Sequence, residues 1–109
     1  MNYVKVAQVS DVQPGKMFAA KLGTEIILLA NIDNEFYAIQ GKCPHFGADL
    51  CAGKLEGTIV TCPKHGAKFD VTNGISTGKA SIAFLKFNVN NCRTYTVKKD
   101  GKDLLVARG

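Results

Sequence analysis

The sequence contains no long hydrophobic run, and this absence limits the classes of protein to consider. Its longest apolar stretch covers residues 26–30, far short of the roughly 20 apolar residues in a membrane-spanning helix. Residues 1–5 show neither the basic segment nor the apolar stretch of a secretory signal peptide. We therefore expect a cytoplasmic protein without a membrane span. Its four cysteines are then metal ligands or reduced thiols rather than a disulfide framework.

Several functional motifs are also missing. The chain has no catalytic triad, no glycine-rich nucleotide-binding loop and no second metal motif beyond the one described below, so we do not expect an enzyme. A formal net charge of +5 at first suggests nucleic-acid binding. The 14 basic residues are spread along the chain, however, and only Lys98 and Lys99 are adjacent. The charge pattern therefore disfavours nucleic acid as a partner.

What the sequence does contain is a series of short apolar alternations that predict β-strands. Alternating or β-rich segments cover residues 3–9, 16–22, 25–32, 36–39, 85–89, 94–98 and 104–107. Asp33-Asn34 and Asp100-Gly101 are typical of tight hairpin turns between such strands. No segment of the chain has helical periodicity with suitable caps. We therefore expect one all-β domain that spans residues 1–109.

Residues 41–80 differ in composition from the rest of the chain. They hold both histidines, three of the four cysteines and two of the three prolines. Two short motifs stand out, Cys43-Pro44-His45 and Cys62-Pro63-Lys64-His65, and 16 residues separate His45 from Cys62. We interpret the segment as a loop-rich insertion between strands, and not as a separate domain.

Each motif combines one thiol with one imidazole, and both zinc and iron–sulfur centres use these ligands. A single zinc ion is more often bound by like pairs, such as C-x2-4-C with H-x3-5-H, and Cys-x-His fits that spacing poorly. Two mixed loops can instead hold a two-metal cluster from both ends. A mononuclear zinc site and a purely structural set of cysteines and histidines remain the alternatives at this point.

The pattern C-P-H-x16-C-P-K-H-G resembles the Rieske signature C-x-H…C-x-x-H, and Phe69-Asp70 also match that family. With the strands on both sides, the resemblance covers essentially the whole chain. It implies the Rieske fold, an antiparallel β-sandwich or barrel base with a smaller loop-rich cluster-binding subdomain at about residues 41–80. It also implies one [2Fe–2S] cluster, with Cys43 and Cys62 on one iron and His45 and His65 on the other.

The resemblance further implies a soluble, monomeric one-electron carrier. Such a protein takes electrons from a flavoprotein reductase and passes them to a terminal oxygenase or another acceptor. Two alternatives stay open: a non-catalytic Rieske subunit fixed within a larger oxidoreductase complex, and a zinc-binding structural module that uses the same four ligands. The colour of the purified protein distinguishes the zinc-binding module from the electron carrier and the fixed subunit, because an iron–sulfur protein is red-brown.

The residues around the ligands suggest a low redox potential for a Rieske centre. High-potential members of the family carry a Ser and a Tyr that donate to the cluster sulfurs, and the matching positions here are Ala67 and Phe69. Those members also join their two loops by a disulfide, whereas Ala48 and Lys64 stand at the matching positions. We expect a midpoint potential in the lower half of the range of about −150 to +300 mV that this ligand set spans.

Other residues near the motifs have a functional and an ordinary interpretation. Gly47 and Gly66 can bring backbone N–H groups close to the cluster sulfurs, or they can be turn glycines. The family's third loop often contains Gly-Pro-Ala, whereas this chain has 78–80 as Gly-Lys-Ala, without proline. Cys51 and Cys92 fit no ligand pattern, and we expect buried free thiols, with a disulfide between them as the alternative.

Four lysines flank the expected ligands. They could form a basic collar that attracts an acidic redox partner, or simply a solvated face. The four residues are Lys42, Lys64, Lys68 and Lys79.

Overall fold

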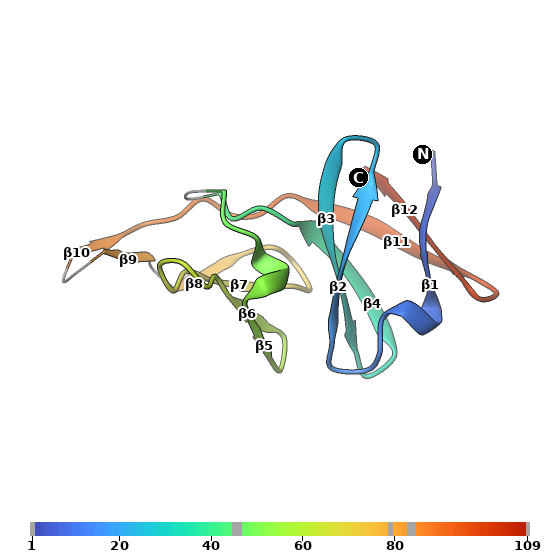
Figure 1. The fold of residues 1–109 in the computed structure, drawn as a ribbon, viewed down its shortest axis with the longest axis horizontal. Helices are drawn as coiled ribbons and strands as arrows, with labels where there is room; N and C mark the ends of the chain where they lie inside the picture. Colours follow the sequence, from blue (N-terminus) through green and yellow to red (C-terminus); the bar gives the residue numbers. More distant parts are fainter. Residues whose placement is uncertain (1, 45–46, 79, 83–84, 109) are drawn as a thin grey trace.

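The computed structural model describes residues 2–44, 47–78, 80–82 and 85–108 (Figure 1). Every pair of neighbouring strands in it is antiparallel, which confirms the all-β prediction. The larger sheet has six strands in the order β1-β12-β11-β4-β3-β2. Its strands are β1 (Val4–Gln8), β2 (Met17–Leu22), β3 (Glu25–Ile32), β4 (Glu35–Gln40), β11 (Thr94–Asp100) and β12 (Asp103–Arg108).

Strand β3, which lies between β4 and β2, is buried on both of its faces. Successive side chains of a strand point to opposite faces of the sheet. In β3 this alternation divides the apolar residues between two cores. Leu28 and Ala30 pack in the core that also contains Cys43. Ile27 and Leu29 pack in a second core, formed within the larger sheet. The apolar run that we identified in the sequence is therefore the layer between the two cores.

Two hairpin turns connect neighbouring strands of the larger sheet. Asp33 and Asn34 have φ values of 52° and 69°, the left-handed conformation that a type I′ turn requires at both central residues. The predicted turn between β3 and β4 is thus confirmed. In the last hairpin, Asp100 pairs with Asp103. The hairpin was predicted correctly, but its turn consists of Gly101 and Lys102 and begins one residue later than expected.

A smaller sheet lies within residues 41–80, the segment that we interpreted as a loop-rich insertion, and its strands were not predicted. It contains four strands in the order β5-β6-β7-β8. They are β5 (Lys54–Glu56), β6 (Ile59–Thr61), β7 (Lys68–Asp70) and β8 (Ser76–Gly78). Each has only three residues, which is too short to produce a recognisable alternation.

The remaining elements are small. Strands β9 (Ala80–Ile82) and β10 (Leu85–Phe87) form a hairpin at one end of the molecule (Figure 1). The strand predicted at 85–89 is therefore observed only over 85–87, and it pairs with β9 and not with the larger sheet. Two 3-10 helices, η1 (Val9–Asp11) and η2 (Leu50–Ala52), are the helical elements of the described residues. None of the described helices could cross a membrane.

Candidate metal centre

The first candidate ligand loop follows the end of β4 and is closed by two backbone hydrogen bonds. The N–H of Cys43 donates to the carbonyl of Ala48 at 2.7 Å, and the N–H of Gly47 donates to the carbonyl of Cys43 at 2.9 Å. The thiol-bearing residue is only 2 % exposed. This loop therefore turns around its cysteine and keeps that side chain inside the protein.

The second loop, between β6 and β7, has the same backbone hydrogen bonds. The N–H of Cys62 donates to the carbonyl of Ala67 at 2.7 Å, and the N–H of Gly66 donates to the carbonyl of Cys62 at 3.1 Å. Cys62 is 3 % exposed. The two loops share the sequence C-P-x-x-G-A. This repeat is visible in the sequence but was not among the predicted features, because the two histidines occupy different positions within it.

The glycine at the fifth position of each loop is a turn residue. Gly47 and Gly66 have φ values of 69° and 75°, a left-handed conformation in which a side chain is strained. Their N–H groups donate to the carbonyls of the two cysteines. The hydrogen bonds thus favour the ordinary interpretation of these glycines over N–H groups that point at cluster sulfurs.

The structure brings two of the four predicted ligands into one core. Cys43 and Cys62 belong to the same buried cluster, which lies against Leu28 of β3. His65 is half-buried. His45 lies outside the described residues, and the described ones include no group of three or more His, Cys, Asp or Glu side chains that could hold a metal.

Comparison with known proteins identifies the family. The chain matches the Rieske [2Fe-2S] domain over residues 2–86. It belongs to the Rieske [2Fe-2S] family. The biphenyl 2,3-dioxygenase ferredoxin component of Rhodococcus jostii (strain RHA1) is 38% identical over 106 residues, which cover 97% of this chain and 92% of that protein.

Solved Rieske structures have the same fold. The ferredoxin of carbazole 1,9a-dioxygenase from Nocardioides aromaticivorans IC177 superposes with a TM-score of 0.85 at 29% identity, over 100% of both chains. A chain in a complex of reduced oxygenase and oxidized ferredoxin of carbazole 1,9a-dioxygenase gives a TM-score of 0.79 at 28% identity. That match covers 96% of this chain and 92% of the other. The predicted Rieske fold is confirmed.

The Rieske domain implies a [2Fe–2S] cluster, and the described residues fit such a group. Two thiols from loops with the same backbone hydrogen bonds lie in one apolar core that is almost closed to water. Thiolate sulfur in an apolar environment is a ligand suited to iron–sulfur chemistry. Ala67 and Phe69, the positions that we compared with high-potential members, are fully buried in the same core. Neither side chain has a hydroxyl group that could donate to a cluster sulfur.

The two remaining cysteines are free thiols, as predicted, but only Cys92 of the two is buried. Cys92 is buried in the same core as Cys43 and Cys62. Its burial, followed by the charges of those two cysteines, raises the pKa of the Cys92 thiol to about 12. Cys51 is only half-buried, and its burial, together with the Asp49 carboxylate, raises the pKa of that thiol to about 12. Both groups are therefore neutral at physiological pH.

The described lysines of the proposed collar are on the surface. Lys42, Lys64 and Lys68 are exposed, and Lys79 lies outside the described residues. The Nζ of Lys68 donates to Oγ1 of Thr61 at 3.4 Å. Their positions are compatible both with partner binding and with a solvated face.

Proposed function

We propose that this chain is a soluble, cytoplasmic one-electron carrier that consists of a single Rieske domain over residues 1–109, with residues 41–80 as its cluster-binding part. In this proposal Cys43 and Cys62 bind one iron, and His45 and His65 bind the other. The observation that carries the assignment is the pair of loops with the same backbone hydrogen bonds, each of which buries one cysteine in a shared core.

The cluster supplies reversible uptake of one electron when it is bound. The chain's own residues set the conditions for that exchange. The two cysteines anchor the loops in a core from which water is excluded. Each loop is braced by its own backbone hydrogen bonds, and Pro44 and Pro63 restrict the backbone beside the ligands. Such loops change little in geometry between two charge states.

The names of the relatives suggest the partners. They are ferredoxin components of dioxygenase systems, and one of the solved structures is a complex of a ferredoxin with its oxygenase. We extend this to the present chain as an electron carrier from a flavoprotein reductase to a terminal oxygenase or another acceptor. The chain acts as a monomer in this scheme, and the chemical step takes place on the acceptor.

Metal analysis and spectroscopy test the cluster assignment. Protein prepared anaerobically should be red-brown and contain two irons and two acid-labile sulfides per chain, as a [2Fe–2S] centre requires. After reduction by dithionite it should show the EPR signal of a Rieske centre. Zinc without iron or sulfide would refute the proposal.

Serine and alanine substitutions test the ligands one by one. Cys43→Ser, Cys62→Ser and His65→Ala should each abolish or strongly reduce cluster content, and the same holds for His45→Ala. Cys51→Ser is the matched control, because Cys51 is a half-buried thiol of the same segment that we do not assign to the cluster. Full cluster content in Cys62→Ser, or loss of the cluster in the control alone, would contradict the ligand set.

A reconstituted electron-transfer assay tests the carrier role. The chain should support turnover when it replaces the ferredoxin component in a biphenyl-type dioxygenase system, and the Cys62→Ser variant should not. The alternative of a fixed subunit is favoured if flavoprotein reductases do not reduce the cluster-containing chain and if the chain purifies only within a larger complex.

A further inference from the structure

Residues 91–93 hydrogen-bond both to the segment that follows β7 and to the end of β4, which leads into the first candidate ligand loop. Oδ1 of Asn91 accepts from the N–H of Ser76 at 2.8 Å. The N–H of Cys92 donates to the carbonyl of Gly74 at 2.8 Å. These two bonds reach the turn between β7 and β8, downstream of the second loop. The third residue, Arg93, reaches the strand that leads into the first loop.

Gln40, the last residue of β4, receives that contact with both its backbone and its side chain. The N–H of Gln40 donates to the carbonyl of Arg93 at 2.9 Å. In return, the N–H of Arg93 donates to Oε1 of Gln40 at 2.7 Å. The other end of the same side chain, Nε2, donates to the carbonyl of Lys42 at 2.7 Å. One amide group therefore connects two chain segments that are 53 residues apart.

The carbonyl that Gln40 holds is at the entrance of the first loop. Lys42 directly precedes Cys43 and forms an isolated β-bridge with Asp49 across the loop. Residues just before and after this bridge are also bonded, since the N–H of Leu50 donates to the carbonyl of Gly41 at 2.9 Å. The orientation of the peptide between Lys42 and Cys43 therefore depends on this bridge and on the side chain of Gln40.

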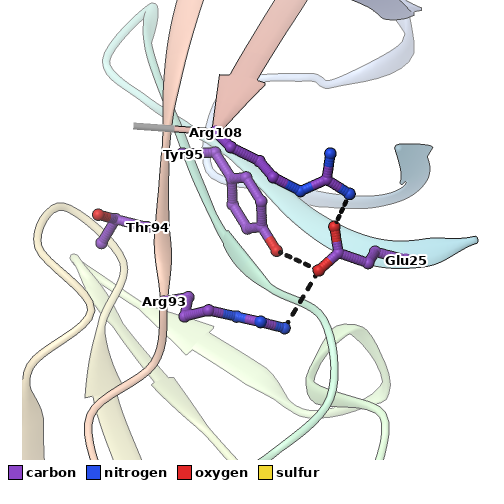
Figure 2. A pocket seen from close by; sticks show the side chains of 5 residues that line it. All are labelled: Glu25, Arg93, Thr94, Tyr95 and Arg108. Carbon is purple, nitrogen blue, oxygen red and sulfur yellow. Dashed lines mark hydrogen bonds and ion pairs between the residues drawn. The ribbon is translucent and has the colours of Figure 1, made fainter. Parts of the chain in front are cut away.

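Arg93 is itself fixed to the larger sheet. Figure 2 shows its guanidinium directed at the Glu25 carboxylate, which also receives Arg108 and the hydroxyl of Tyr95. The Arg93–Glu25 distance is 3.2 Å. A continuous path of contacts thus runs from β3 through Arg93 and Gln40 to the first ligand loop.

We propose that Gln40 is a positioning residue for the first ligand loop. Its side-chain amide links the carbonyl of Lys42 to the N–H of Arg93. The residue does not contact the cluster in this proposal. Its effect is to fix the direction in which the chain enters the turn around Cys43. The inference rests on the proposed function in one respect, which is that the loop around Cys43 carries cluster ligands.

Two substitutions separate the contributions of the Gln40 side chain. Gln40→Met keeps the length of the side chain and removes both of its hydrogen bonds. Gln40→Glu keeps an acceptor for the N–H of Arg93 but removes the donor to the carbonyl of Lys42. The matched control is Gln13→Met, because Nε2 of Gln13 also donates to a backbone carbonyl, that of Ser10, at 2.8 Å.

Hydrogen exchange measured by mass spectrometry gives the decisive comparison. In Gln40→Met, peptides that cover residues 41–50 should exchange about fivefold faster, as expected for the loss of ordinary hydrogen bonds near a surface. Peptides that cover residues 60–68 should be unchanged. Gln40→Glu should also accelerate exchange in 41–50, and Gln13→Met should alter neither loop.

Three results would overturn the proposal: no change in 41–50 in either Gln40 variant, an equal rise in both loops, or the same rise in Gln13→Met. If Gln40→Met does not fold, the exchange rates of residues 41–50 in the folded Gln40→Glu protein test the proposal instead. In reduced holoprotein, the EPR g-values should shift in the Gln40 variants and stay constant in the control. Iron and sulfide measurements on the unsubstituted chain test the proposed function separately, since the exchange comparison does not depend on which metal is bound.

Discussion

Replacement of Asn31 by alanine should destabilise the larger sheet without changing the metal centre. Asn31 is the buried polar residue of β3, with 2 % exposure. Its Nδ2 donates to the carbonyl of Val12 at 2.8 Å, and its Oδ1 accepts from the N–H of Asn34 at 2.8 Å. The side chain thus fastens the segment after η1 to the β3–β4 turn.

The size of the effect follows from these two contacts. Val12 is 1 % exposed, so its carbonyl loses a partner in a place where water replaces it poorly. An unsatisfied buried acceptor costs about 1–3 kcal/mol. Asn34 is exposed, so the loss of its hydrogen bond adds only about 1 kcal/mol. The total is about 2–4 kcal/mol, which corresponds to a decrease in Tm of about 10–20 °C for a domain of this size.

Thermal unfolding followed by far-UV circular dichroism under anaerobic conditions measures this change. The control is Asn73→Ala, because Asn73 is exposed and its Oδ1 accepts from the N–H of Ile75, two residues away, at 2.9 Å. We expect that control to change stability by no more than about 1 kcal/mol. The EPR spectrum of the reduced Asn31→Ala protein should match that of the unsubstituted chain. A Tm decrease equal to that of the control would refute the reasoning.

Three further predictions concern the site and the charged cluster. Ala67→Ser and Phe69→Tyr should each raise the midpoint potential, because each adds a hydroxyl donor in the core of the site, and a redox titration that shows no rise would contradict this. The hydrogen bond from Arg108 holds the pKa of Glu25 below its usual 4.5. The stability that Glu25 contributes is therefore present above that pH and lost on acidification, and the stability difference between the unsubstituted chain and Glu25→Gln should shrink as the pH falls below 4.5 in urea titrations. If the lysine collar attracts an acidic partner, Lys68→Gln should flatten the dependence of the electron-transfer rate on ionic strength, and an unchanged slope would mark a solvated face.

The sequence predicted the strands of the larger sheet because each of them is long enough to show its pattern. Strand β3 was predicted with its correct bounds, 25–32, since an apolar run and a turn at Asp33-Asn34 delimit it. The strands of the smaller sheet were missed for the opposite reason. Three residues between glycines and polar turns have no period, and only pairing with a neighbour, as between β6 and β7, makes them strands.

The ligand residues of the candidate site could be proposed from the sequence, but the residues that hold the ligand loops in place could not. The mixed Cys and His motifs left a zinc site open, and the resemblance to the Rieske signature indicated the cluster type. Gln40 gave no such signal, because its partners are Lys42 and a backbone amide 53 residues away. Cys92 gave none either, since its place beside Cys43 and Cys62 depends on how the chain returns after β10. Contacts of this kind come from the tertiary fold and not from local pattern.

Local and long-range contacts have different roles in the candidate metal centre. The ligand loops are shaped by local hydrogen bonds, which repeat in both copies of C-P-x-x-G-A. Local bonds alone cannot fix the distance between two loops, because each loop could move as a unit. That distance is constrained by β3, which contributes Leu28 and Ala30 to the shared core. It is also constrained by residues 91–93, which bind the chain just beyond the second loop's strand β7 and, at Gln40, just before the first loop. Since β3 belongs to the larger sheet and residues 91–93 lead directly into its strand β11, the geometry of the centre depends on how that sheet folds.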